Sequence, residues 1–233
     1  MHRSLLIAAL WLWCASSSAQ PDAGRQPTMD DPMLASYCEP GQGCHSCVLP
    51  YSHWETAAVL RLQGVQPGDV LLVSPVDGEW TVGTRRGVST WQLGVQFGAR
   101  GQEVLESCQD RPALPGAIQP LDGEWEFTRE SVTFQGCPPE VQEDMGGMET
   151  VRIPLAFARP FLGALDPSMP ALVQTGPNAF SALKATDITR EFSTVTVTSP
   201  QRMWVGAFTS IDLPDSGGTC IVSTTAVLLL VAE

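Results

Sequence analysis

Residues 121–127 have the sequence Leu-Asp-Gly-Glu-Trp-Glu-Phe, which ends in alternating acidic and aromatic residues. Successive side chains of a β-strand point to opposite faces, so Trp125 and Phe127 share one face and the glutamates share the other. Asp122 and Gly123, just before them, are residues typical of a tight turn. The pattern predicts a strand that begins at a turn and buries its Trp in an apolar core.

A near copy of this phrase lies earlier in the chain. Pro-Val-Asp-Gly-Glu-Trp at 75–80 matches Pro-Leu-Asp-Gly-Glu-Trp at 120–125. We predict that both copies begin a strand in the same way and that Trp80 and Trp125 are structural residues. Short apolar runs separated by Gly and Pro follow along the chain, so the predicted fold class is all-β.

The first residues have the pattern of a secretory signal peptide, which we place at 1–19. A positive charge precedes a short apolar run, and Ser17 and Ala19 occupy the small-residue positions of a cleavage site. The run is too short for a permanent membrane-spanning helix, so no transmembrane anchor is expected. A lipid anchor on Cys14 is the alternative, but a small residue is expected before such a cysteine, and Trp13 is large. The protein is therefore predicted to be secreted or periplasmic.

The charge of the chain argues against several classes of partner. It has 25 acidic and 13 basic residues, a net charge of −12, and loss of Arg3 with the signal peptide makes the mature form more acidic. Such a surface repels nucleic acid and anionic membranes, so neither is expected as a partner. Solubility alone explains the acidity, and the charge does not predict an oligomeric state.

The chain has seven cysteines, and cleavage of the signal peptide removes Cys14 and leaves six. An even number of cysteines in an exported chain predicts three disulfides, although fifteen pairings can be drawn. The alternatives are a zinc site using His45 or His53, which is geometrically awkward, and a redox-active Cys-x-x-Cys pair, which lacks a helix. We predict disulfides and no metal site. The cysteines involved are Cys38, Cys44, Cys47, Cys108, Cys137 and Cys220.

Composition divides the mature chain into four segments. Residues 20–35 are polar and contain prolines, which predicts a flexible leader. Residues 36–108 are predicted to form a Cys-containing β unit, and the Pro-rich segment 109–120 a linker. Residues 121–233 contain about eight candidate strands, which suit a small antiparallel up-and-down β-barrel without edge strands. The alternative is a single larger β domain.

Local patterns support particular strands in each unit. In the first unit, residues 56–62 and 91–97 are predicted strands, the second because its apolar residues alternate. In the second unit, residues 132–134 are predicted to form a hairpin with the Trp125 strand. The long strand predicted at 188–198 changes its apolar phase part of the way along, which predicts a bulge or a bend.

Gly123-Glu124-Trp125 resembles the Gly-x-Trp that opens the first strand of calycins, the group of lipocalins and their relatives. The resemblance implies a barrel whose Trp plugs the closed end and is covered by an Arg from a late strand, for which Arg202 is the candidate. The group also has a Thr-Asp-Tyr motif, and Thr-Asp-Ile at 186–188 matches two of its three positions. Such barrels bind small apolar ligands or inhibit other proteins, so the resemblance implies a binding function.

A fainter resemblance lies in the first unit. Residues 64–70, Gly-Val-Gln-Pro-Gly-Asp-Val, followed by Gly-Glu-Trp at 78–80, are similar to the edge of a jelly-roll sugar-binding domain. This resemblance adds carbohydrate to the candidate ligands.

The sequence contains no familiar catalytic motif. It has no Gly-x-Ser-x-Gly nucleophile elbow, no phosphate-binding Gly-rich loop and no dinucleotide-binding glycine pattern. We assign the carboxylates of the two repeated phrases to turns and to the surface, and not to a glycosidase pair. The acidic segment 140–149 lacks the ligand spacing of a calcium loop. We therefore predict no enzymatic activity and no cofactor.

The function predicted from these observations is a secreted or periplasmic, non-enzymatic binding protein. Its barrel is expected to hold a small apolar ligand or a carbohydrate in a cavity lined by Phe127, Phe134, Phe192 and Trp204. The alternative is a structural or surface-interaction protein of the cell envelope without a ligand pocket. An enzyme is the third hypothesis and would need His53 beside a carboxylate in a cleft.

Overall fold

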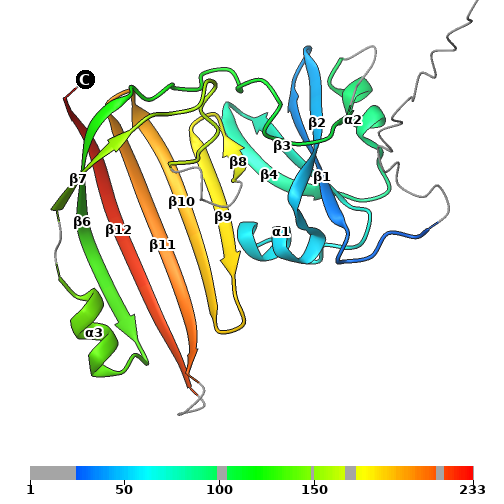
Figure 1. The fold of residues 1–233 in the computed structure, drawn as a ribbon. Helices are drawn as coiled ribbons and strands as arrows, with labels where there is room; N and C mark the ends of the chain where they lie inside the picture. The colour runs from blue at the N-terminus through cyan, green and yellow to red at the C-terminus, as the bar shows by residue number, and fades with distance from the viewer. Residues whose placement is uncertain (1–24, 99–103, 148–149, 166–171, 214–217, 233) are drawn as a thin grey trace, which may run out of the picture.

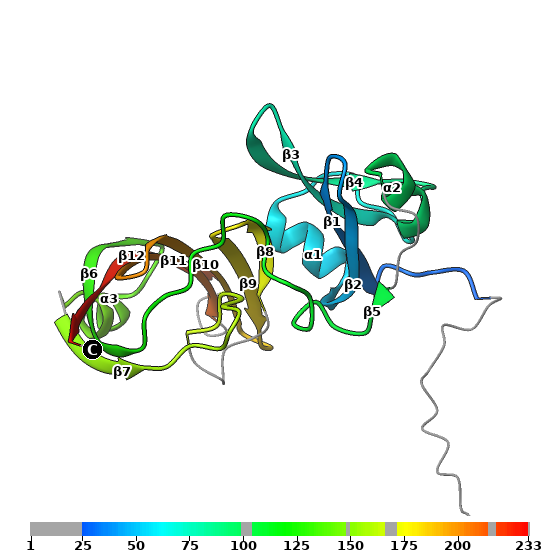
Figure 2. The same cartoon turned by 90° about the horizontal axis from the view of Figure 1, so that it is seen from above.

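The fold consists of two β-sheets. The computed structural model describes residues 25–98, 104–147, 150–165, 172–213 and 218–232. The chain is mostly β, with 54% strand and 12% helix, and its two sheets lie side by side (Figure 1, Figure 2). The predicted signal peptide lies outside the described residues. Within the ranges given above, no helix is long and apolar enough to cross a membrane.

The first sheet is built from the residues before the Pro-rich segment. Its elements are β1 (Pro32–Glu39), β2 (Gly43–Ser52), α1 (His53–Leu60), β3 (Val70–Val76), β4 (Glu79–Arg85), α2 (Thr90–Gln96) and β5 (Val104–Leu105). The strand order is β4-β3-β1-β2-β5, and β1 pairs with β2 antiparallel and with β3 parallel. Because β1 begins at Pro32, the flexible leader predicted for 20–35 extends too far.

The second sheet is antiparallel and open. Its elements are β6 (Gly123–Gln135), α3 (Pro139–Met145), β7 (Thr150–Leu155), β8 (Val173–Gly176), β9 (Ala179–Ala185), β10 (Thr189–Ser199), β11 (Arg202–Leu213) and β12 (Gly218–Ala232). The strand order is β7-β6-β12-β11-β10-β9-β8, so β7 and β8 are opposite edges that do not pair. The predicted closed barrel is therefore wrong. Edge strand β8 instead packs against β3 and β4 of the first sheet (Figure 1).

Trp125 is the centre of the second core, as predicted. Its side chain is fully buried on the face of the sheet that we call the inner face, and its indole Nε1–H donates to the carbonyl of Leu121 at 3.1 Å. The segment after β7 places Phe157 and Phe161 over this face. The rings of Trp125, Phe157, Phe161 and Phe180 form a chain of edge-to-face contacts with centroid distances of 5.3–5.6 Å. These rings cover the inner face that barrel closure would otherwise have buried.

Arg202 does not cover Trp125, which corrects the expectation from the calycin resemblance. Arg202 pairs with Leu229 on β12, whereas Trp125 pairs with Leu230. Neighbouring residues of a strand point to opposite faces, so Arg202 lies on the opposite face, which we call the outer face. There its guanidinium lies over the ring of Trp204, 5.1 Å from the centroid.

Strand β6 is one continuous strand and not the hairpin predicted for its second half. Ser131 pairs with Thr225 and Arg129 with the next residue of β12, so Glu130 is an extra residue in the ladder. This bulge changes the alternation, because one extra residue moves every later side chain to the other face. As a result, Phe134 stays on the same inner face as Trp125 although their spacing is odd.

The strands predicted at 56–62 and 91–97 are wrong, because most of these residues form helices α1 and α2. Each helix begins with a capping box. A serine side chain accepts a hydrogen bond from the backbone N–H three residues later, and the side chain of that later residue accepts from the serine N–H. The two pairs are Ser52 with Glu55 and Ser89 with Gln92.

The two repeated Asp-Gly phrases have different roles. Asp77 and Gly78 both have positive φ, 52° and 86°, as a type I′ turn requires, and they join β3 to β4. Asp122 makes no such hairpin. Its carboxylate accepts the backbone N–H of Phe157 at 2.9 Å and pairs with Arg159 at 3.0 Å. The second Asp therefore anchors the segment that covers the inner core.

The segment predicted as a linker, 109–120, is packed between the two sheets. Leu114 is 4% exposed and belongs to the first core. Arg111 is buried, with its guanidinium 4.1 Å from the ring centre of Tyr37 and hydrogen-bonded to Gln174 of β8. Burial lowers the pKa of Arg111 and raises the pKa of Tyr37. The Arg111 side chain is thus buried where the two sheets are in contact.

Two further contacts join the sheets. The Tyr51 hydroxyl donates to the carbonyl of Leu183 on β9 at 3.3 Å and accepts the N–H of the same residue at 3.2 Å. Trp80 is half-buried against the first core, and a side chain at Gly176 of β8 would meet it at 3.5 Å. Trp80 therefore lies where the two sheets meet. The division into two domains stays a prediction.

The six cysteines of the described residues form three disulfides, as the sequence predicted. They are Cys38–Cys44, Cys47–Cys108 and Cys137–Cys220. The first joins directly opposite residues of the β1–β2 hairpin, and the third ties Cys137, two residues before α3, to β12. In the described part of the chain, no group of three or more His, Cys, Asp or Glu residues is arranged to hold a metal ion.

Candidate ligand pocket

The four aromatic residues predicted to line one cavity lie on two different faces of the second sheet. Phe127 and Phe134 pair with buried residues of β12 and share the inner face with Trp125. Phe192 and Trp204 lie on the outer face. All four are half-buried, but the sheet separates them into two pairs. They do not line one cavity.

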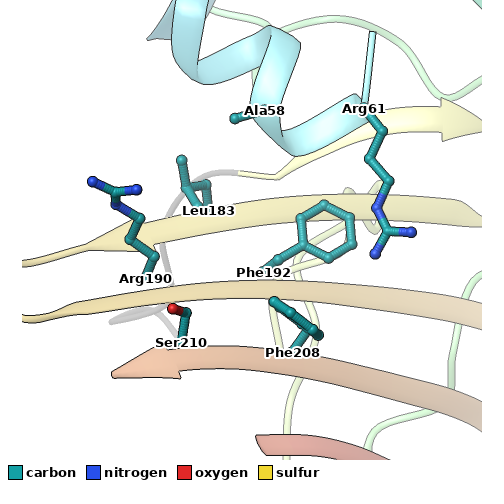
Figure 3. A pocket seen from close by; sticks show the side chains of 7 residues that line it. All are labelled: Ala58, Arg61, Leu183, Arg190, Phe192, Phe208 and Ser210. Carbon is teal, nitrogen blue, oxygen red and sulfur yellow. The ribbon is translucent and has the colours of Figure 1, made fainter. Parts of the chain in front are cut away.

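A pocket lies where helix α1 approaches the outer face of the second sheet. Its volume is about 280 Å³, and it is only partly enclosed. Figure 3 shows the side chains that line it. Strands β9, β10 and β11 form its floor. The lining residues are Ala58, Arg61, Leu183, Arg190, Phe192, Phe208 and Ser210. Of the four residues predicted from the sequence, Phe192 alone belongs to this pocket.

The floor of the pocket is a row of apolar side chains across three strands. Phe192 of β10 pairs directly with Leu183 of β9 and with Phe208 of β11, so the three side chains point to the same face. Phe208 remains 37% exposed. Two residues along the strand, Arg190 pairs with Ser210 and adds a polar row beside the apolar row. The floor thus combines an aromatic surface with hydrogen-bonding groups.

Arg61 forms a side of the pocket from the end of helix α1. It is the C-cap of this helix and has φ 51°, in the left-handed region that favours glycine. A non-glycine residue there costs on the order of 1 kcal/mol. This backbone conformation ends the helix, and the Arg61 guanidinium lies over the Phe192 ring, 5.7 Å from its centre.

The two arginines of the pocket have no carboxylate partner among the described residues. Four other arginines, namely Arg25, Arg86, Arg152 and Arg159, each form an ion pair within 4.0 Å. Arg61 and Arg190 form none there, although the chain has 25 acidic residues. Both side chains are exposed. The pocket therefore has two free positive charges beside an aromatic floor.

His53, the residue on which the enzyme hypothesis depended, is a buried structural residue. It is 3% exposed, its Nδ1 lies 2.8 Å from the backbone carbonyl of Asp31, and its Nε2 accepts the N–H of Gly68 at 3.1 Å. Both ring nitrogens thus contact backbone groups. The Asp31 carboxylate faces Arg25 and Thr28. His53 therefore has no free nitrogen for acid–base chemistry.

Comparison with known proteins found no relatives. The chain matches no protein-family model, no curated protein and no solved structure. These comparisons neither support nor contradict the resemblances to calycins and to a sugar-binding jelly roll. The interpretation of the pocket rests on its geometry.

Proposed function

We propose that the protein is an exported, non-enzymatic binding protein that takes a small apolar ligand in the pocket between α1 and the outer face of the second sheet. The observation that supports this is the row of Leu183, Phe192 and Phe208 beneath a helix that covers it only in part. Three disulfides are consistent with an oxidising compartment outside the cytosol.

The size of the pocket limits the ligand. Its volume of about 280 Å³ lies just below the usual range of ligand pockets, about 300–1,000 Å³. A ligand of one or two rings, or the end of a longer chain, suits this space. The open side leaves room for a polar part of the ligand in solvent.

A neutral fluorescent dye tests this proposal. N-phenyl-1-naphthylamine should bind with a saturable increase in fluorescence, and Phe192→Ala should weaken the binding about tenfold. A tenfold loss corresponds to about 1.4 kcal/mol, near the value expected for an aromatic side chain that is only half-buried. Phe134→Ala is the matched control, because Phe134 is also half-buried but lies on the inner face. Equal binding by both variants, or no saturable binding by the parent, would reject the proposal.

A surface-interaction protein of the envelope is the second candidate. The observation that favours it is the exposure of apolar side chains on the outer face beyond the pocket floor, where Leu229 is 43% exposed and Trp204 half-buried. This candidate has no ligand pocket, so it is favoured over the first if the dye does not bind at a saturable site.

A further inference from the structure

We infer that the ligand of this pocket is an anion: an aromatic or alkyl group that carries a carboxylate, paired by Arg190 or Arg61. This inference rests on the proposed function, because it names the class of ligand for the same pocket. The apolar row holds the body of the ligand, and the arginines select its charge.

The two positive charges of the pocket, Arg61 and Arg190, lie on either side of its floor. In Figure 3, Arg61 and Arg190 lie on opposite sides of the apolar floor, with Phe192 and Leu183 between them. A ligand that lies along the floor therefore has a cation near each end. A monocarboxylate can be paired in either orientation, and an acid with two charged ends can use both arginines.

The charges of Arg61 and Arg190 are not neutralised within the described part of the protein. The chain has 25 acidic and 13 basic residues, so it has acids in excess to pair with an exposed arginine. Neither arginine has such a partner within the described ranges. A positively charged ligand would be repelled by both, and an apolar neutral ligand would bring each arginine closer to a low-dielectric group without neutralising it. A carboxylate on the ligand would neutralise an arginine as the apolar part of the ligand displaces water around it.

The geometry of Arg61 also supports an acidic ligand. Its left-handed backbone and its contact with the Phe192 ring hold the guanidinium at the edge of the aromatic floor. Contact with an aromatic ring does not use the N–H groups of a guanidinium, which lie in its own plane and can form two parallel hydrogen bonds to a carboxylate. The contact with Phe192 thus leaves the N–H groups of Arg61 able to bind an acid at the edge of the floor.

Three ligands with the same ring system separate charge from apolar contact. We would measure displacement of N-phenyl-1-naphthylamine by 2-naphthoate, 2-naphthamide and 2-naphthylmethylammonium. The carboxylate should bind roughly fivefold tighter than the amide, as expected for ion pairs at an exposed site, and the ammonium should bind weakest. From about 0.01 M to about 1 M salt, the advantage of the carboxylate should disappear, because the Debye length falls from about 30 Å to about 3 Å.

Glutamine variants assign the preference to the two arginines. The double variant Arg61→Gln/Arg190→Gln should bind carboxylate and amide equally. Arg152→Gln is the matched control, because Arg152 lies on edge strand β7, four strands away from β10, and should keep the preference. If the dye binds but the parent does not prefer the carboxylate, the inference is wrong and the proposed function stands. If the dye does not bind to the parent, the proposed function fails first.

Discussion

Removal of the Trp125 side chain should unfold the second sheet or come close to it. The indole is fully buried, packs edge-to-face on Phe157 at 5.6 Å and donates a hydrogen bond to Leu121. Trp125→Ala removes all of these contacts at once. The rings of the inner face touch in sequence, so a cavity at Trp125 also removes one side of the packing around Phe157.

The expected loss can be built from these contacts. Replacing a buried aromatic residue by Ala costs about 3–5 kcal/mol. The edge-to-face pair adds about 0.5–1.5 kcal/mol beyond buried area, and the lost hydrogen bond about 1 kcal/mol, so Trp125 belongs at the upper end of the range. We expect about 4–5 kcal/mol, a large part of the ~5–15 kcal/mol that stabilises an ordinary domain. Trp125→Phe keeps the ring contact but loses the N–H group, and it should lose about 1–2 kcal/mol.

Urea unfolding followed by near-ultraviolet circular dichroism measures these losses. Trp204→Ala is the control, because Trp204 is half-buried on the outer face and lies over no part of the inner core. It should lose no more than about 1–2 kcal/mol. If Trp125→Ala unfolds at the same urea concentration as the parent or as Trp204→Ala, the assignment of Trp125 as the centre of the second core is refuted.

Two further substitutions test the anchors described above. Asp122→Asn should lower stability at neutral pH, because the Phe157 amide lowers the pKa of the folded carboxyl. The difference should begin to shrink as the pH falls below the unfolded pKa of about 3.9 and should vanish only below the lower, folded pKa. Urea midpoints at several pH values measure this, and a difference that persists in acid contradicts it. Arg111→Ala should destabilise both sheets together by about 2–4 kcal/mol, because it opens a cavity against Tyr37 and leaves Gln174 without its donor. Two separate unfolding transitions in the parent would contradict this expectation.

Strands with apolar residues on one face were predictable from the sequence. In residues 151–155, apolar side chains alternate and Pro154 has the opposite parity, which predicts an edge strand; β7 is the edge of the second sheet. Gly-Pro-Asn at 176–178 is a turn sequence between two short apolar runs, which predicts a hairpin, and β8 and β9 form that hairpin. In both places the local pattern agrees with the tertiary contacts, so the local sequence alone was enough to predict the strand.

The two helices of the first unit were missed because they are short. α2 has seven residues, and over two turns the apolar positions of residues 91–97 fit a period of two as well as a helical period. The signal that distinguishes the two structures lies at the cap. Ser89 followed by Gln92, and Ser52 followed by Glu55, are capping boxes that predict a helix start.

Phe192 explains why only part of the pocket was predictable. The change of apolar phase at 188–198 suggested a bulge, but β10 pairs regularly from Thr189 to Val197, so Phe192 and Val195 point to opposite faces of a regular strand. A strand that is apolar on both faces needs contacts on both faces. The core packs on the inner face of β10. Helix α1 covers the outer face only in part, and Arg61 contacts Phe192 there from more than a hundred residues away in sequence, which no local pattern predicts. The phase change was therefore a sign of the second contact surface, and that surface carries the proposed ligand site.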